Sequence, residues 1–219
     1  EMQDINFLFK SWKLLLVSGV FGLLLSTILI LLMLYKLTPY FLSIHQKRLR
    51  DQNEEPVPKI GGIGIMGSFF LTLLLLWLIP FDTQMTDFEK LNNNRILGFT
   101  IGGMLAWNLG FFDDLLQIRA RWKLGGQLLL AFFAIHTGFA IDNLHGPFFQ
   151  EISLGLWSWP VTILWIVTVM NAVNLIDGLD GLAGGIVLTV LTTLGVISWW
   201  NGTFPLLLII IALFGATLG

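Results

Sequence analysis

The sequence contains no cysteine, little charge and neither of the common nucleotide-binding loops. Without cysteine, the chain has no disulfide framework and no thiol chemistry. Charged residues make up 12% of its 219 positions, against roughly 25% in soluble domains, and 55% of the positions are hydrophobic. Walker-type and dinucleotide-binding fingerprints are also absent. These absences exclude thiol enzymes and ordinary soluble domains, and they indicate an integral membrane protein.

The charged residues are clustered, and the gaps between them are long enough to cross a bilayer, which takes about 20 residues as a helix. The first gap is too long for the core of a signal peptide and has no cleavage-like ending, so it predicts a retained anchor. The expected fold is therefore all-α, a polytopic bundle of about seven transmembrane helices that forms a single transmembrane domain over residues 1–219. The predicted spans are Leu14–Leu34, Gly62–Ile79, Ile96–Phe112, Leu124–Ala140, Trp157–Val173, Leu182–Trp200 and Phe204–Gly219.

Lysine and arginine are distributed unevenly between the connections, and their excess marks the cytoplasmic side of a membrane. The first and third connections hold eight of these residues, and the opposite side holds four. The N-terminus is therefore expected on the outer, periplasmic side. The cytoplasmic connections are expected near residues 35–61, 113–123 and 174–181, and every polar cluster with chemical potential lies in one of them.

The first polar cluster is the doublet Asp113-Asp114 at the inner end of a predicted span. Adjacent carboxylates repel each other and need a cation, and Mg²⁺ suits carboxylate oxygens and usually also binds substrate phosphate. Arg121 and Lys123 follow within ten residues and could neutralise such a phosphate. Two alternatives stay open: a polar helix end for the doublet, and the orientation signal for the two cations.

The second cluster is the stretch Asn171–Gly185, which lies between two long apolar runs. Its polar residues recur at every third position: Asn171, Asn174, Asp177 and Asp180. Acids in such a place are costly in a membrane and usually face a polar cavity or mark a functional site. A regular helix would turn the first and last of the four to opposite sides, whereas the glycine after each aspartate favours a loop. We therefore expect a loop in which all four could meet one ligand, with a simple turn cluster as the alternative.

Gly61 and Gly62 open the second predicted span. A helix N-terminus offers unpaired backbone N–H groups and partial positive charge to an anion such as phosphate. The alternative is close packing of helices, for which glycine is also suited.

Four motifs occur in order along the chain: Pro58-Lys-Ile-Gly-Gly62, Gly110-Phe-Phe-Asp-Asp114, Arg121-Trp-Lys123 and Asn171-Ala-Val-Asn-Leu-Ile-Asp-Gly-Leu-Asp-Gly-Leu-Ala183. Together they resemble the polyprenyl-phosphate N-acetylhexosamine-1-phosphate transferases of glycosyltransferase family 4, and they are most similar to the undecaprenyl-phosphate GlcNAc-1-phosphate branch. The resemblance implies a multi-pass enzyme of the bacterial cytoplasmic membrane whose active site faces the cytoplasm. It implies that polyprenyl phosphate attacks the β-phosphorus of a UDP-N-acetylhexosamine, giving polyprenyl-diphospho-sugar and UMP. This reaction is the first membrane step of cell-envelope polysaccharide synthesis, with Mg²⁺, or alternatively Mn²⁺, as cofactor.

The resemblance also implies roles for individual residues. The metal is expected at Asp113, Asp114 and Asn174. The residues expected to bind substrate are Lys123, Arg121, Asn174, Asp177, Gly61 and Gly62. The residues expected to act in catalysis are Asp113, Asp114, Asp177 and Asp180, the first two by deprotonating the lipid phosphate or holding the metal. Direct attack and a covalent aspartyl intermediate both stay open.

The chain departs from the family pattern at its end. It stops before the Gly-Asp stretch that supplies a further metal-binding aspartate and before a histidine-rich or arginine-rich loop that contacts the sugar nucleotide. The 219 residues are therefore expected to be the front part of a longer enzyme and to be inactive alone. The expected partners are the UDP-sugar, polyprenyl phosphate, the lipid bilayer and a second copy in a homodimer, with no nucleic acid. The alternatives are a membrane transporter and a noncatalytic remnant of the family.

Overall fold

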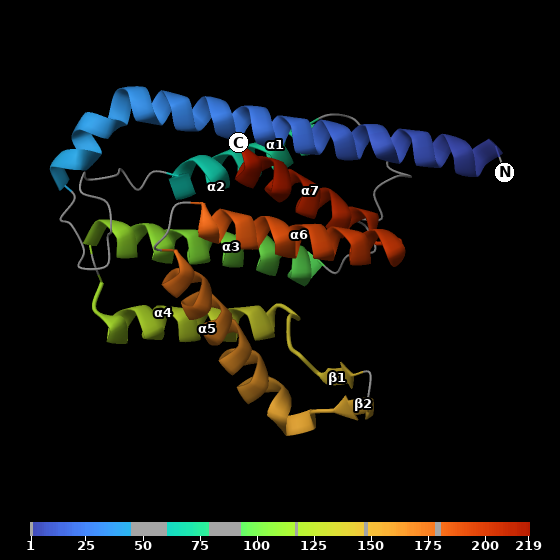
Figure 1. Ribbon diagram of the computed structural model, residues 1–219. Coiled ribbons are helices and arrows are strands. Elements are labelled where there is room, and N and C mark those ends of the chain that lie inside the picture. The colour runs from blue at the N-terminus through green and yellow to red at the C-terminus, as the bar shows by residue number, and fades with distance from the viewer. Residues whose placement is uncertain (1, 45–60, 79–92, 117, 147–148, 178–180) are drawn as a thin grey trace. The chain divides into compact units, whose positions relative to one another are not determined.

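The computed structural model describes residues 2–44, 61–78, 93–116, 118–146, 149–177 and 181–219. These residues form mainly α-helices, with a short β-hairpin in one connection (Figure 1). The helices are α1 (Met2–Ile44), α2 (Gly61–Leu78), α3 (Asn93–Leu116), α4 (Ala120–His136), α5 (Ser158–Ile176), α6 (Leu182–Trp200) and α7 (Phe204–Leu218). The elements between α4 and α5 are β1 (Asn143–Gly146), β2 (Phe149–Ser153) and the 3-10 turn η3 (Gly155–Trp157).

The apolar stretches are helical because a backbone in lipid finds no water and must satisfy its N–H and C=O groups internally. Each predicted span overlaps one of these helices. Within the described residues, five segments, in α1, α2, α3, α5 and α6, are long and apolar enough to cross a membrane, and α7 is apolar but shorter. The prediction of an all-α membrane protein is therefore confirmed. The number of spans and the periplasmic N-terminus stay predictions.

The chain divides into two compact units, and the first comprises residues 1–90 and 178–219. In this unit α7 packs against α1, α2 and α6. Its buried apolar centre consists of Leu14, Leu15, Leu76, Leu207 and Leu208. Glycine lets α1 and α7 approach closely, because a Cβ added at Gly22 would lie 2.5 Å from the carbonyl oxygen of Ala212. That residues 1–219 form a single transmembrane domain stays a prediction.

The second unit comprises residues 91–177, and in it α4 packs against both α3 and α5. Two glycines show that α3 and α4 run antiparallel. A Cβ added at Gly126 of α4 would lie 2.8 Å from Cδ1 of Leu109, near the end of α3, whereas Gly98 near the start of α3 lies against Thr137, just after α4. The end of α3 therefore lies beside the start of α4.

A hairpin closes the connection from α4 to α5. Strands β1 and β2 pair antiparallel, with Asn143 opposite Ser153. Next to the hairpin, Ser158 Oγ donates a hydrogen bond to Asp142 Oδ1, and the Ile141 N–H donates to Thr162 Oγ1, each at 2.8 Å. The strands were not predicted from the sequence, because segments of four and five residues are too short for their pattern of apolar and polar side chains to indicate a strand.

Candidate active site

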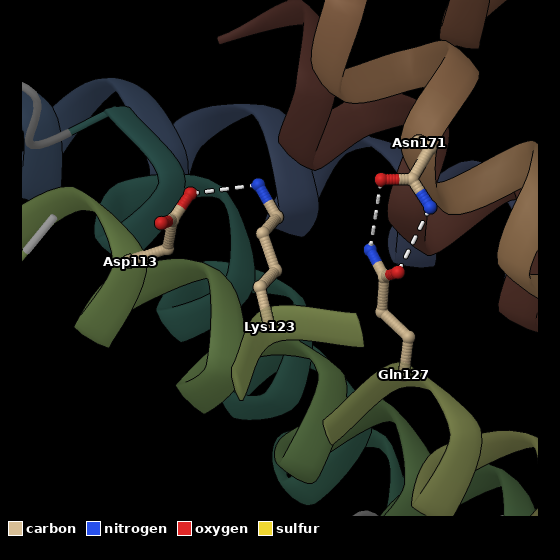
Figure 2. A network of polar contacts seen from close by, with 4 residues as sticks. All are labelled: Asp113, Lys123, Gln127 and Asn171. Atoms are coloured by element: carbon tan, nitrogen blue, oxygen red, sulfur yellow. Dashed lines mark hydrogen bonds and ion pairs between the residues drawn. The ribbon is translucent and has the colours of Figure 1, made fainter. Parts of the chain in front are cut away.

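A buried ion pair joins the end of α3 to the start of α4. Lys123 Nζ donates to Asp113 Oδ2 at 2.7 Å, and the two side chains are 18% and 9% exposed (Figure 2). The antiparallel packing brings them together, since α4 begins only four positions after α3 ends. A charge in an apolar segment is costly unless it is paired, and here the two opposite charges lie in direct contact. Both residues were expected in one site, but their direct contact was not predicted from the sequence.

Asp114 and Arg121 flank this pair. The predicted connection near residues 113–123 is shorter than expected, because α3 continues to Leu116 and holds both aspartates in its last turns. Asp114 is half-buried, whereas Arg121 is exposed in the first turn of α4. Neighbouring positions on a helix point about 100° apart, so Asp114 presents its carboxylate on a different side of α3 from Asp113. Lys123 relieves the repulsion expected within the doublet.

A second polar contact lies one helical turn further along α4. Asn171 Nδ2 donates to Gln127 Oε1 at 2.8 Å, and Gln127 Nε2 donates to Asn171 Oδ1 at 3.3 Å (Figure 2). Gln127 is buried, and Asn171 is half-buried on α5. Gln127 was not predicted as a site residue, although its spacing of four residues from Lys123 puts both on one helix face.

The direction of α5 places its last turn at the same end of this unit as Lys123. Gln127 and Asn171 meet towards the start of α4, whereas the rings of His136 and Trp159 lie 5.5 Å apart at the end of α4. Helices α4 and α5 therefore run in opposite directions. The start of α4 and the last turn of α5, which carries half-buried Asn174, thus lie at one end of the unit.

The loop expected in Asn171–Gly185 begins later than predicted. Helix α5 continues to Ile176, so the expectation of a loop is wrong for Asn171 and Asn174, because the apolar residues between them continue the helix. Asp177 is the exposed C-terminal cap, and its N–H donates to the Val173 carbonyl at 3.1 Å.

The remaining predicted residues of this stretch come after the end of α5. Gly181 has φ 74°, a left-handed conformation that residues other than glycine rarely adopt, so a glycine is required in the turn here, as expected. Asp180 lies outside the described residues. Its predicted part in catalysis therefore stays a prediction.

Gly61 and Gly62 form the first turn of α2, in the first unit. A Cβ on either residue would meet nothing described within 4 Å, whereas a Cβ on Gly64 would meet the Ile30 side chain. Close packing therefore explains Gly64 but neither Gly61 nor Gly62. Their position at a helix start agrees with the anion-binding hypothesis, and their part in the site stays a prediction.

The metal-binding hypothesis can be compared with the donor groups present. Among the described residues, no three histidine, cysteine, aspartate or glutamate side chains are grouped so that they could hold a metal ion. Mg²⁺ requires less from a protein, since it usually takes one or two carboxylates and completes its shell with water and substrate phosphate. Asp113, Asp114 and Asn174 fit this donor set. Binding of the ion to Asp113 would compete with Lys123.

Comparison with known proteins identifies relatives of this chain. A sequence model of glycosyl transferase family 4 matches residues 96–219. A probable undecaprenyl-phosphate N-acetylglucosaminyl 1-phosphate transferase of Bacillus subtilis (strain 168) is 30% identical over 178 residues, covering 81% of this chain and 46% of the relative. A phospho-N-acetylmuramoyl-pentapeptide-transferase of Streptococcus pyogenes serotype M4 (strain MGAS10750) is 30% identical over 203 residues, covering 83% of this chain and 58% of the relative.

The chain spans about half the length of the curated relatives it matches. No solved structure matches it. The family match runs from α3 to α7 and therefore includes the Asp113-Asp114 doublet, Lys123 and the stretch Asn171–Gly185. The extent of this match shows that the chain belongs to glycosyl transferase family 4.

Proposed function

We propose that this protein transfers N-acetylhexosamine 1-phosphate from a UDP-sugar to polyprenyl phosphate, giving polyprenyl-diphospho-sugar and UMP. The observation that carries the proposal is the buried Asp113–Lys123 pair beside Asp114, at the end of the unit where the last turn of α5 also lies. Membership of the family supports the reaction class. The name of the Bacillus subtilis relative supports undecaprenyl phosphate as acceptor and N-acetylglucosamine as the sugar.

Lys123 is suited to bind a phosphate of the substrate. Its ammonium group has three N–H donors, and the hydrogen bond to Asp113 holds it at a defined place in the first turn of α4. The remaining donors can bind phosphate oxygens without first ordering a flexible side chain, which reduces the entropic cost of binding. Exposed Arg121 offers a second cation with a planar set of donors.

The substrate adds negative charge to this end of the unit. Asp113, Asp114 and Asp177 are matched in number by Arg119, Arg121 and Lys123, and an anionic pyrophosphate adds negative charge that a divalent cation can compensate. We propose that Asp113, Asp114 and Asn174 hold Mg²⁺, with Mn²⁺ as a substitute. The ion would stabilise the charge that develops on the pyrophosphate during transfer.

Asp113 and Asp114 then have separate tasks. Asp113 orients Lys123 and contributes to holding the metal, whereas Asp114, on another side of α3, accepts the proton of the lipid phosphate or also binds the metal. In the direct route, an oxygen of the lipid phosphate forms a bond to the β-phosphorus. The bond from the β-phosphorus to the bridging oxygen breaks, and UMP leaves with its electron pair. The excess of lysine and arginine supports a site that faces the cytoplasm of a bacterial cell.

The proposal is tested by measuring UMP release from the full-length protein in liposomes, with undecaprenyl phosphate, a panel of UDP-sugars, and Mg²⁺ or a chelator. We expect release with UDP-N-acetylglucosamine and none with the chelator. Asp114→Asn should lower turnover by at least about 100-fold, the contribution usual for a positioned proton acceptor, without changing the unfolding midpoint. Glu151→Gln, a loss of an exposed carboxylate in β2, is the matched control and should retain activity. Failure of every UDP-sugar to release UMP would refute the proposed function.

A further inference from the structure

The amide pair between Gln127 and Asn171 joins the two helices that carry Lys123 and Asn174. Besides its bond to Gln127, Asn171 Nδ2 donates to the Val167 carbonyl at 2.8 Å. Both N–H groups of the Asn171 amide and its oxygen are therefore engaged within the protein. A side chain that is satisfied in this way has little to offer a ligand, and its effect is on the packing of α5 against α4.

A reciprocal amide pair allows less variation in the rotation and register of two packed helices than a contact between apolar side chains does. Apolar contacts tolerate small rotations and shifts, whereas a buried polar pair satisfies its hydrogen bonds in one register only. Gln127 is 2% exposed, so water cannot replace its partner. Rotation of α5 would break the contact and leave the Gln127 amide unsatisfied.

The two amides lie close along their helices to the residues of the proposed site. Lys123 is one turn before Gln127 on the same face of α4, and Asn174 is three residues after Asn171 on α5. We propose that Gln127 and Asn171 are positioning residues that set the rotation of α5 on α4 and thereby hold Asn174 at the Asp113–Lys123 pair. The effect on turnover depends on the proposed function, and the effect on helix geometry does not.

An exchange of the two side chains tests the effect on turnover. Gln127→Asn and Asn171→Gln each change the reach of one amide, whereas the double variant keeps both amides and their combined length. We expect each single variant to lower kcat by about tenfold or more, because small displacements of reacting groups are costly. The double variant should recover to within about threefold of the wild type, as expected for coupled residues. The proposal would be overturned if the fold reduction in kcat of the double variant equalled the product of the two single reductions, or if the single variants kept the wild-type kcat.

A distance measurement tests the geometry without an activity assay. The 219 residues contain no cysteine, so spin labels can be attached after Leu129→Cys on α4 and Leu164→Cys on α5, both exposed positions. In this background, Gln127→Leu with Asn171→Leu removes both amides and leaves neither unpaired, which should preserve folding. We expect the distance distribution between the labels to shift or broaden.

Thr168→Val, which removes an exposed hydroxyl from α5, is the matched control and should leave the distribution unchanged. An unchanged distribution in the doubly substituted protein would overturn the proposal. If the distribution broadens but the wild type releases no UMP from any UDP-sugar, the proposed function fails and the inference on helix geometry stands.

Discussion

The Asp113–Lys123 pair contains two charges that an apolar environment stabilises only together. Each charge loses hydration on burial, and their mutual attraction compensates for that loss. Removal of one partner therefore costs more than the pair itself contributes, because the other charge stays buried and loses this attraction. Such a loss is not expected for the surface contact between His145 Nε2 and Glu151 Oε1, which are 3.6 Å apart on well-exposed side chains.

Lys123→Met should accordingly destabilise the protein, by about 3 kcal/mol, because it removes the ammonium group whose attraction offsets the desolvation of the Asp113 carboxylate. Adding Asp113→Asn to this variant should restore part of the loss. The measurement is the unfolding midpoint in mixed micelles. Arg121→Met, two positions away on the same helix and exposed, is the control and should change stability by less than about 0.5 kcal/mol. Equal effects of the two substitutions would contradict a structural role for the pair.

The resemblance to the family implied that Asp113, Lys123 and Asn174 belong to one site, and the structure brings Asp113 and Lys123 into direct contact. The sequence could not predict Gln127, since a single glutamine in an apolar run has no partner until α5 is placed against α4. It also gave Asn171 a ligand-binding role that the structure assigns to a helix contact. Spacing along the chain indicated which residues matter, and only the packing of helices showed which of them contact each other.

Among the helices, the contact between α1 and α7 depends on the smallest side chains. A Cβ at Gly22 would lie 2.5 Å from the Ala212 carbonyl oxygen and 2.9 Å from the Ala216 amide nitrogen. Both atoms belong to the backbone of α7, so a larger residue cannot be accommodated by a change of side-chain rotamer. In lipid, where packing rather than water drives helix association, such close approach contributes directly to stability.

We therefore expect Gly22→Ala to lower the free energy of unfolding by about 1–3 kcal/mol, the usual range for overpacking. Gly185→Ala is the control, because a Cβ at Gly185 meets nothing described within 4 Å. It should be neutral or stabilising by about 0.5 kcal/mol, since alanine favours a helix over glycine. If the two variants had the same unfolding midpoint within error, the close approach of α1 and α7 at Gly22 would not contribute to stability.

The positions of the helices could be predicted from the sequence, and their ends only approximately. Hydrophobic length determines where a span must lie, which is why each predicted span overlaps a helix. The ends of the helices depend on local contacts, and the hydrophobicity of the sequence gives no information on these contacts. Helix α3 extends four residues beyond the predicted Phe112, and α5 three residues beyond Val173, so residues assigned to connections lie in helices.

For the whole molecule, the orientation in the membrane depends on whether α4 crosses the bilayer. Helix α4 has 17 residues, which is about 25 Å, whereas the hydrocarbon core is about 30 Å thick. Local thinning of the bilayer can compensate for such a difference at modest cost. The lysine and arginine pattern predicts the crossing, because it favours a cytoplasmic connection before α4 and an external hairpin after it.

Labelling from one side of the membrane tests this prediction. Arg119→Cys, before α4, and His145→Cys, in β1, place single thiols at exposed positions, and the 219 residues contain no other cysteine. In right-side-out vesicles, a membrane-impermeant maleimide should modify the His145→Cys variant and spare the Arg119→Cys variant until the vesicles are opened. Modification of both variants in sealed vesicles would mean that α4 does not cross. Because Arg119 lies one position before α4, the helix that carries Lys123, the same measurement identifies the compartment from which the proposed nucleotide-sugar substrate would reach Lys123.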